Sequence, residues 1–349
     1  MPIDLTQTSS FDYFLPQELI AQDPVEPRDS ARLLVIRKGT KSFEHNIFRD
    51  IKDYLRPGDL LVLNDTRVLP ARVEGIKKYG GAKTEVFFLR ADQQTANKWT
   101  ALVKPGHKLP VNSIVSINDK IDIIIGEKLE DGIRNIYFPM GCDPLEIIHE
   151  YGTTPLPHYI TDSHSDAEEY QTVYSKIEKE NSVASPTAGL HFTQELLDEI
   201  SEMGIDKTFI TLQVGLGTFR PVKTDDISKH IMHSEICEIG NESAEKIFRA
   251  KCEKRRVVAV GTTVVRTLET FAETYGTIKP GVLDTNLFIR PGFKFKVVDA
   301  LITNFHLPKS TLLMLVAAFA GYDTIMDAYR EAVRNKYRFF SFGDATFIY

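Results

Sequence analysis

Short segments with alternating apolar and polar residues fill the chain from about residue 67 to residue 140. They are rich in β-branched and aromatic residues, Gly, Pro, Asn and Asp separate them, and no helical period lies between them. The six segments are ARVEGIK, KTEVFFLR, KWTALVK, SIVSIN, IDIIIGE and GIRNIYF. We expect six strands that close into a small antiparallel barrel, because closure removes the exposed strand edges that promote aggregation.

Elsewhere the chain alternates apolar strands with amphipathic helices. The segments at 208–214, 256–262 and 296–303 are largely apolar, as strands are in a sheet that is covered on both faces. Helices are expected at TQELLDEISEMG, ended by Gly204; NESAEKIFRAKCEK, capped by Asn241; TLLMLVAAFA, capped by Ser310 and ended by Gly321; and TIMDAYREAVR, begun by Asp323.

These patterns predict a mixed α/β (α+β) fold. A discontinuous α/β catalytic domain would comprise residues 1–66 and 155–349, and the small six-stranded antiparallel β-barrel would be inserted between them as residues 67–154. A chain of 349 residues is long enough for about two such domains.

The net charge of −6 and the pI of about 5.9 mean that the chain as a whole repels polyanions. Any contact with nucleic acid therefore needs a local basic patch, for which KCEKRR (251–256) and RPGFKFK (290–296) are candidates. Charged runs of this kind are more often solvated faces.

Cys142, Cys237 and Cys252 are widely spaced and form no zinc or disulfide motif, so we expect reduced, mostly buried thiols. The amino terminus lacks the basic start and apolar run of a secretion signal. The longest apolar run, LLMLVAAFA, is shorter than the roughly 20 residues of a membrane span. We expect a cytoplasmic monomer without a membrane partner.

Candidate chemistry lies where strands end, because ligands of open α/β sheets bind at the carboxyl ends of the strands. In VVAVGTTVVRTLE an apolar strand runs through Gly261, Thr262 and Thr263 into a helix, which predicts an anion site of free amides and hydroxyls. Arg266 follows on the same helix face. The alternative is a capped helix with a surface arginine.

In VGLGTFRP, Gly215 and Gly217 follow a strand, but Arg220 and Pro221 stand where a dinucleotide fingerprint needs its third glycine and a helix. This leaves either a turn that lets a ligand approach the backbone or a plain β-turn. The KHIMHSE segment lacks the two-histidine helical spacing of zinc hydrolases, so no metal site is predicted.

Three further segments place polar side chains in loops at strand or helix ends. They are SPTAGLHF with Ser185, Thr187 and His191; TNFHLP with Asn304 and His306; and NDTR at 64–67. A lone histidine is more often structural than catalytic, and NDTR is equally suited to closing the entry to the barrel.

Taken together, the segments resemble the S-adenosylmethionine:tRNA ribosyltransferase-isomerase family of queuosine biosynthesis. The resemblance runs from about residue 11 to the end, and its most telling stretches are SPTAGLHF, VGLGTFRPV, VGTTVVRTLE and LITNFHLPKSTLLMLVAAFAG. It implies an α/β domain interrupted by a β-barrel. It also implies transfer and isomerisation of the ribosyl part of S-adenosylmethionine onto 7-aminomethyl-7-deazaguanosine at the tRNA wobble position, giving epoxyqueuosine and releasing adenine and methionine.

The implied co-substrate is S-adenosylmethionine, the implied partner is a tRNA with a queuosine-type anticodon, and no metal is implied. Asp65 or Glu235 would hold the substrate amine, and His191, His233 or His306 would move protons. The donor-binding residues would be Thr187, Gly189, Gly215, Gly217, Thr218, Gly261, Thr262, Thr263, Arg266 and Asn304. The tRNA-binding residues would be Asn64, Arg67, Arg72, Lys294 and Lys296.

The chain departs from the family pattern at four positions: Gln213 replaces a usual histidine, Ser185 an alanine, His158 a proline and Glu169 a basic residue. The last departure weakens any phosphate contact at that position. Two alternatives remain open from the sequence, namely another S-adenosylmethionine-dependent tRNA-modifying enzyme such as a methyltransferase, and a non-catalytic RNA-binding protein.

Overall fold

The computed structural model describes residues 3–92, 94–157, 159–161, 163, 166–215, 222 and 224–349. The predicted Gly217 and Thr218 lie outside these residues, as does His158. The chain forms two compact units. The first contains Met1–Thr66, Pro157–Lys179 and Ser185–Tyr349, and the second contains Arg67–Leu156 and Glu180–Ala184.

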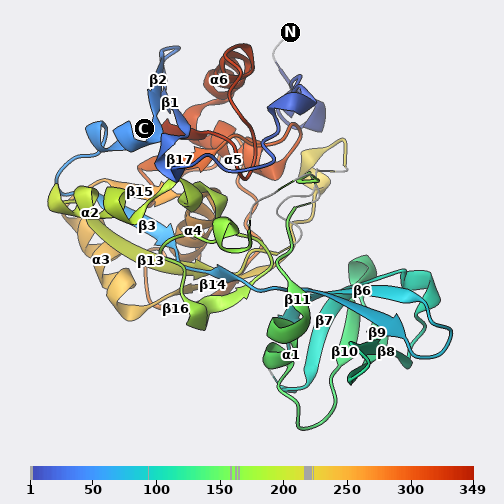
Figure 1. Ribbon diagram of the computed structural model, residues 1–349. Coiled ribbons are helices and arrows are strands. Elements are labelled where there is room, and N and C mark those ends of the chain that lie inside the picture. Colours follow the sequence, from blue (N-terminus) through green and yellow to red (C-terminus); the bar gives the residue numbers. More distant parts are fainter. Residues whose placement is uncertain are drawn as a thin grey trace. The chain divides into compact units, whose positions relative to one another are not determined.

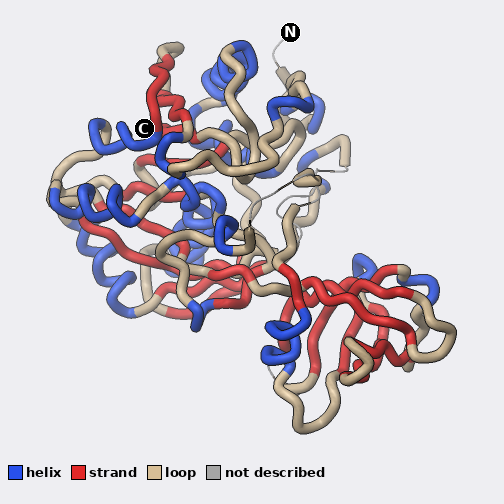
Figure 2. Tube along the Cα trace, in the orientation of Figure 1, coloured by secondary structure: helices blue, strands red, loops and turns tan. Residues whose placement is uncertain are grey.

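The second unit is a closed barrel, which confirms the predicted six-stranded antiparallel architecture for the part of the chain that is described (Figures 1 and 2). Ile76 pairs with Ser116, so the first strand meets the last and no edge remains open. Buried and partly exposed residues alternate along the strands, because successive side chains point to opposite faces. Around the barrel the strands are β5 (Arg72–Lys77), β6 (Lys83–Ala91), β7 (Lys98–Lys104), β10 (Arg134–Tyr137), β9 (Ile121–Lys128) and β8 (Ser113–Ile117).

Short elements complete this unit. Helix α1 (Pro144–Tyr151) is capped by the Asp143 side chain. Strand β11 (Gly152–Thr153) pairs with β5, and β12 (Glu180–Ser182) pairs with β4 (Arg67–Val68). The segment 180–184 therefore packs with the barrel although it follows it in the chain.

The first unit is built on a mixed sheet that has nine strands within the described residues. Its four central strands run parallel to one another. In spatial order the strands are β16 (Gly281–Thr285), β14 (Glu235–Ile239), β13 (Asp206–Leu212), β3 (Leu60–Asn64), β15 (Val257–Val260), β17 (Ala300–Asn304), β18 (Ala345–Ile348), β1 (Arg32–Ile36) and β2 (Phe43–Ile47).

Helices cover both faces of this sheet, which explains why its central strands are almost entirely apolar. On one face, Leu61 and Leu63 pack with Leu196 and Ile200 of α2 (Gln194–Glu202). The opposite face is covered by α3 (Asn241–Cys252) and α4 (Thr262–Tyr275) (Figure 1). Helices α5 (Thr311–Ala320) and α6 (Tyr322–Arg334) pack against each other near the end of the chain.

The helix ends test the capping predictions. Ser310 accepts the amide of Leu313 and Gly321 ends α5, so both predictions are confirmed. The prediction for Asn241 is wrong, because Gly240 accepts the first helical hydrogen bond, from Ala244, and Asn241 already lies inside α3. Helix α6 likewise begins at Tyr322, one residue before the predicted Asp323.

Strand β17 is shorter than the predicted segment 296–303. The Glu269 carboxylate accepts the amides of Lys296, Val297 and Val298, which keeps this stretch out of the sheet. The cysteines are free, but only Cys237 is buried, since Cys142 is partly exposed and Cys252 is exposed. The prediction of mostly buried thiols is therefore wrong.

Within the described residues no single helix is long and apolar enough to cross a membrane. Helices α5 and α6 pass that test only as a pair, bent by 117° at the break between them.

Candidate active site

A pocket lies at the carboxyl ends of the central strands of the first unit. Strands β13, β3, β15 and β17 are parallel, so the loops that follow them meet at one edge of the sheet. About 620 Å³ of empty space lies in and in front of the pocket, part of it open to solvent. It is lined by Tyr159, Ser185, Pro186, Thr187, Ala188, Val214, Gly261, Thr262, Thr263, Thr303, Asn304, Phe305, His306, Leu307, Ser310, Leu312, Phe340 and Ser341.

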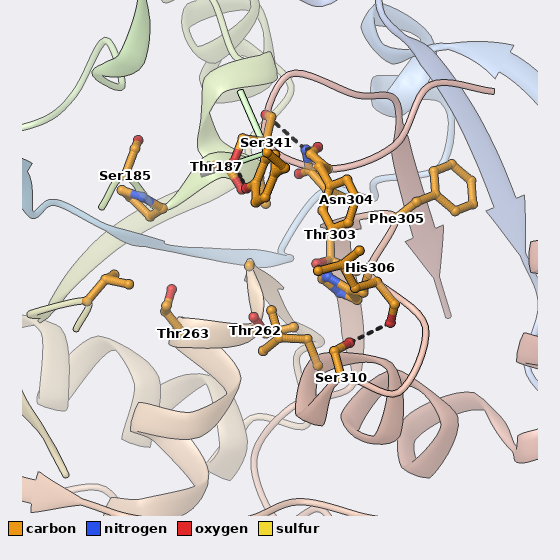
Figure 3. Close-up of a pocket in the computed structure, with 18 residues that line it drawn as sticks. Ser185, Thr187, Thr262, Thr263, Thr303, Asn304, Phe305, His306, Ser310 and Ser341 are labelled. Atoms are coloured by element: carbon orange, nitrogen blue, oxygen red, sulfur yellow. Dashed lines mark hydrogen bonds between the residues drawn. The ribbon is translucent and has the colours of Figure 1, made fainter. Parts of the chain in front are cut away.

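The amino end of α4 forms one wall of this pocket (Figure 3). Gly261 precedes the helix with a φ of 93°, which an L side chain rarely adopts, and its amide donates to Ile302 O at 2.8 Å. No side chain of the described residues caps the first turn, which leaves its amides available to a ligand. Because Thr262 and Thr263 are buried, the positive end of the helix dipole lies in a site with little water.

The opposite wall is held by Asn304 at the end of β17. Its Nδ2 donates to Phe340 O at 2.8 Å and to Ser341 O at 3.2 Å. Phe340 has a φ of 73° and stacks on Tyr159, with the ring centroids 4.4 Å apart. The Tyr159 hydroxyl lies 2.6 Å from Ser341 Oγ. This wall therefore combines a flat aromatic surface with the polar side chain of Asn304.

His306 is the histidine that lines the pocket. Its Nε2 lies 3.2 Å from Thr303 Oγ1, and its carbonyl accepts the Tyr13 hydroxyl at 2.5 Å. Burial lowers the pKa of His306 to about 3, so the imidazole is neutral at physiological pH. In Figure 3 it lies among the polar side chains, whereas the ring of Phe305 points away from them.

The 3-10 helix η9 (Thr187–His191) follows Ser185. Its two ends carry the predicted site residues Thr187 and His191, which line different cavities. Ser185 Oγ is buried without a partner in the described part of the chain, and Thr187 lines the pocket. Gly189 has a packing role, because a Cβ there would lie 1.9 Å from the Tyr174 hydroxyl. His191 lines a neighbouring recess instead, and burial lowers its pKa to about 4.

The predicted charged residues lie outside the pocket lining. Asp65 accepts the Thr211 hydroxyl at 2.7 Å and the Lys176 ammonium at 3.0 Å. Glu235 and Arg266 form a buried ion pair, and Glu235 also accepts the Gly215 amide at 2.9 Å. Arg266 further donates to two carbonyl groups, those of Thr285 and Leu287. The pair therefore links α4, β14 and the loop that follows β13.

The predicted tRNA-binding residues are dispersed. Asn64 is fully buried, and its amide pairs with both the N–H and the carbonyl of Leu212. In the second unit Arg67 lies 3.6 Å from Glu180 and Arg72 lies 3.7 Å from Glu85. In the first unit Lys294 is exposed, and Lys296 is exposed and pairs with Glu273 at 2.7 Å. His233 is also exposed and does not line the pocket.

The pocket thus brings together Thr187, Gly261, Thr262, Thr263, Asn304 and His306. Sequence analysis missed Tyr159, Phe340 and Ser341, because no local pattern places the segments around 159 and 340 beside the end of β17. The family resemblance extends to the end of the chain and so includes the segment around 340, but it assigned no role to these residues. Among the described residues no cluster of three or more His, Cys, Asp or Glu that could hold a metal ion occurs.

Comparison with known proteins gives one consistent result. The family described as "Queuosine biosynthesis protein" matches residues 8–348. The chain is 51% identical over 346 residues to the S-adenosylmethionine:tRNA ribosyltransferase-isomerase of Thermosipho africanus, covering 98% of this chain and 99% of the relative. It is 51% identical over 343 residues to the Clostridioides difficile protein of the same name, covering 98% and 99%.

Among solved structures the chain is similar to S-adenosylmethionine tRNA ribosyltransferase from Thermotoga maritima. The TM-score is 0.57 and the sequence identity 41%, and the match covers 98% of this chain and 100% of the other.

Proposed function

Since this chain belongs to the S-adenosylmethionine:tRNA ribosyltransferase-isomerases, the queuosine biosynthesis family, we propose that the pocket at the end of β15 and β17 is where S-adenosylmethionine reacts. The family assignment makes the protein a tRNA-modifying transferase and isomerase with S-adenosylmethionine as co-substrate. The acceptor would be the aminomethyl group of 7-aminomethyl-7-deazaguanosine at the wobble position. The products would be epoxyqueuosine in the tRNA, free adenine and free methionine.

The methionine carboxylate would bind at the amino end of α4. The uncapped amides and the two hydroxyls of Thr262 and Thr263 offer an anion site whose dipole favours negative charge. Arg266 was also predicted here, but its charge is compensated by Glu235, so it would act by holding the site in shape. The buried polar side chains of Ser185 and Asn304 would contact the ribose or the adenine.

The adenine would lie against the aromatic pair of Tyr159 and Phe340. Stacked rings present a flat apolar face, and such a face suits a purine. Gly215, Gly217 and Thr218 remain predicted contacts of S-adenosylmethionine. Of these, Gly215 is fixed through its amide by Glu235.

His306 would carry the proton. A neutral imidazole can accept the acidified proton of the carbon beside the sulfonium, and its lowered pKa makes the resulting imidazolium a strong acid. That acid would then deliver the same proton to a nitrogen of the departing adenine. His191 and His233 stay alternative predictions, as do Asp65 and Glu235 for holding the substrate amine.

The observation that carries this proposal is the convergence of three separate loops, at 185–188, 261–263 and 303–307, on one pocket. The test is incubation with S-adenosylmethionine and a tRNA that carries the aminomethyl-deazaguanine base. Free adenine and methionine, together with an epoxycyclopentane in the RNA mass spectrum, are expected. A methylated tRNA would instead identify a methyltransferase, and tRNA binding without adenine release would identify an RNA-binding protein.

The role of His306 is tested with His306→Ala, which should reduce the single-turnover rate about a hundredfold or more while tRNA affinity is kept. Thr267→Val is the matched control, because Thr267 is buried on α4 outside the pocket lining and its hydroxyl donates to Thr263 O, one turn earlier. An unchanged rate for His306→Ala would remove this residue from the mechanism.

We expect the enzyme to act as a cytoplasmic monomer on tRNAs with a queuosine-type anticodon, without a metal or a membrane. Light scattering and activity after treatment with a chelator test the monomer and the metal independence.

A further inference from the structure

A second recess shares a wall with the pocket. It is lined by Pro24, Val25, Arg28, Glu169, Leu190, His191, Ser341, Phe342 and Gly343, and Ser341 also lines the pocket itself. We refer to it as the Arg28 recess. Its position follows from sheet topology, because β18 is antiparallel to β17 and β1 is parallel to β18. The segments before β18 and β1, which contain Arg338 and Arg28, therefore reach the edge where β17 ends.

The Arg28 guanidinium is held in place by backbone carbonyl groups. Nη1 donates to Gln171 O at 2.6 Å and Nη2 donates to Glu168 O at 3.1 Å. No acidic side chain of the described residues lies within ion-pair distance of it. Since a guanidinium carries five donor hydrogens, these two bonds leave others open to a ligand.

Arg338 and His191 add to the positive character of this region. Arg338 Nη1 donates to Asp23 O at 3.2 Å, and its buried Nη2 has no partner among the described residues. His191 is 4% exposed. Burial is the main reason that the pKa of His191 is lowered; a hydrogen bond with the Asn304 side chain raises it, and the charges of Arg338 and Arg28 lower it further. The arginines therefore create a positive potential at the recess.

The carboxylates of Asp344 and Glu169 reduce the positive potential at the Arg28 recess. Asp344 lies 3.7 Å from Arg338 Nε and accepts the amides of Arg32 and Arg338, so it neutralises Arg338 only in part. Glu169 lines the recess and is partly exposed, and its Oε2 accepts the Asp166 amide at 2.9 Å within its own turn. Neither carboxylate pairs with Arg28.

We propose that the Arg28 recess binds a backbone phosphate of the tRNA next to the wobble nucleotide, whose base enters the pocket on the other side of Ser341. This inference rests on the proposed function. Arginine recognises phosphate oxygens through two parallel hydrogen bonds, and enzymes that act on a base extrude it from the stack. A phosphate contact beside the pocket would hold the extruded nucleotide in register without reading its sequence.

The test compares Arg28→Gln with Arg49→Gln, which also loses one positive charge but lies outside the recess and pairs with Asp29. Affinity for tRNA is measured without S-adenosylmethionine over a range of salt concentrations, and the KM for each substrate is measured separately. For Arg28→Gln we expect about tenfold weaker tRNA binding and a salt slope smaller by about 0.7 to 0.9. The KM for S-adenosylmethionine should change less than about twofold.

A rise in the KM for S-adenosylmethionine instead would assign the recess to the methionine carboxylate and overturn the proposal. Equal tRNA affinity and salt slope in Arg28→Gln and Arg49→Gln would overturn it as well. Glu169→Lys guards against misfolding of Arg28→Gln, because the residue is partly exposed at the rim of the recess and the variant should bind tRNA more tightly. The binding assay needs no turnover, so a wild-type protein that binds tRNA but releases no adenine would refute the proposed function alone.

Discussion

The buried ion pair of Glu235 and Arg266 allows a positioning role to be separated from a catalytic one. Both side chains are nearly inaccessible, at 5% exposure for Glu235 and 4% for Arg266, and Glu235 Oε1 also accepts the Gly215 amide at 2.9 Å. Glu235→Gln keeps the shape and one acceptor oxygen but leaves the Arg266 charge buried without a counter-ion. Breaking a buried pair in this way costs about 3 to 5 kcal/mol.

Such a loss is a large part of the roughly 5 to 15 kcal/mol that stabilise a typical domain. The expected result is a clear shift of the urea midpoint of the first unit. Replacing both partners, as in Glu235→Leu with Arg266→Met, should be less destabilising than the two single changes together, since no buried charge is left unpaired.

Circular dichroism follows the first unit, which contains helices α2 to α6, and the fluorescence of the single tryptophan provides an internal control. Trp99 packs edge-on against Phe88 inside the barrel, so its transition should not move in these variants. A loss below about 1 kcal/mol for Glu235→Gln, with turnover abolished, would refute the positioning role. It would support Glu235 as the residue that holds the substrate amine.

Three further predictions concern burial, packing and capping. Burial lowers the pKa of His306 from 6.5 to about 3, so below pH 6.5 the unfolded chain binds a proton that the folded protein does not. The free energy of unfolding should therefore be unaffected by this group above pH 6.5 and should fall by about 1.4 kcal/mol per pH unit below it. His306→Asn should flatten the dependence of the urea midpoint on pH, and an unchanged dependence would contradict the burial argument. Gly189→Ala should cost about 1 to 3 kcal/mol, because its Cβ would lie 1.9 Å from the Tyr174 hydroxyl, and adding Tyr174→Phe should restore part of the thermal midpoint. Ser310→Ala should cost about 1 kcal/mol through loss of the α5 cap, with Ser310→Asp as the conservative control; equal midpoints for the two variants would argue against capping.

Local patterns were sufficient for the barrel and for several helix ends. Alternation within six short segments predicted the strands, because side chains alternate between faces whatever the strand pairs with. Ser310 and Gly321 were predictable for the same reason, since a cap acts on amides and carbonyls of its own helix. The cap predicted at Asn241 is wrong because its neighbour Gly240 adopts the cap conformation. Sequence patterns predict the ends of a helix less reliably than its presence.

The sequence by itself indicated the six barrel strands and several strands and helices of the first unit, and it placed the chemistry at the ends of strands. Only the tertiary structure decided which side chains meet there. Strand β18 runs antiparallel to β17 and so brings Phe340 and Ser341 beside Asn304, a placement set by pairing between distant segments. Burial, which is likewise a property of the whole fold, made His306 neutral and paired Arg266 with Glu235. Neither effect is encoded in a local pattern, because each depends on what the rest of the chain packs around the group.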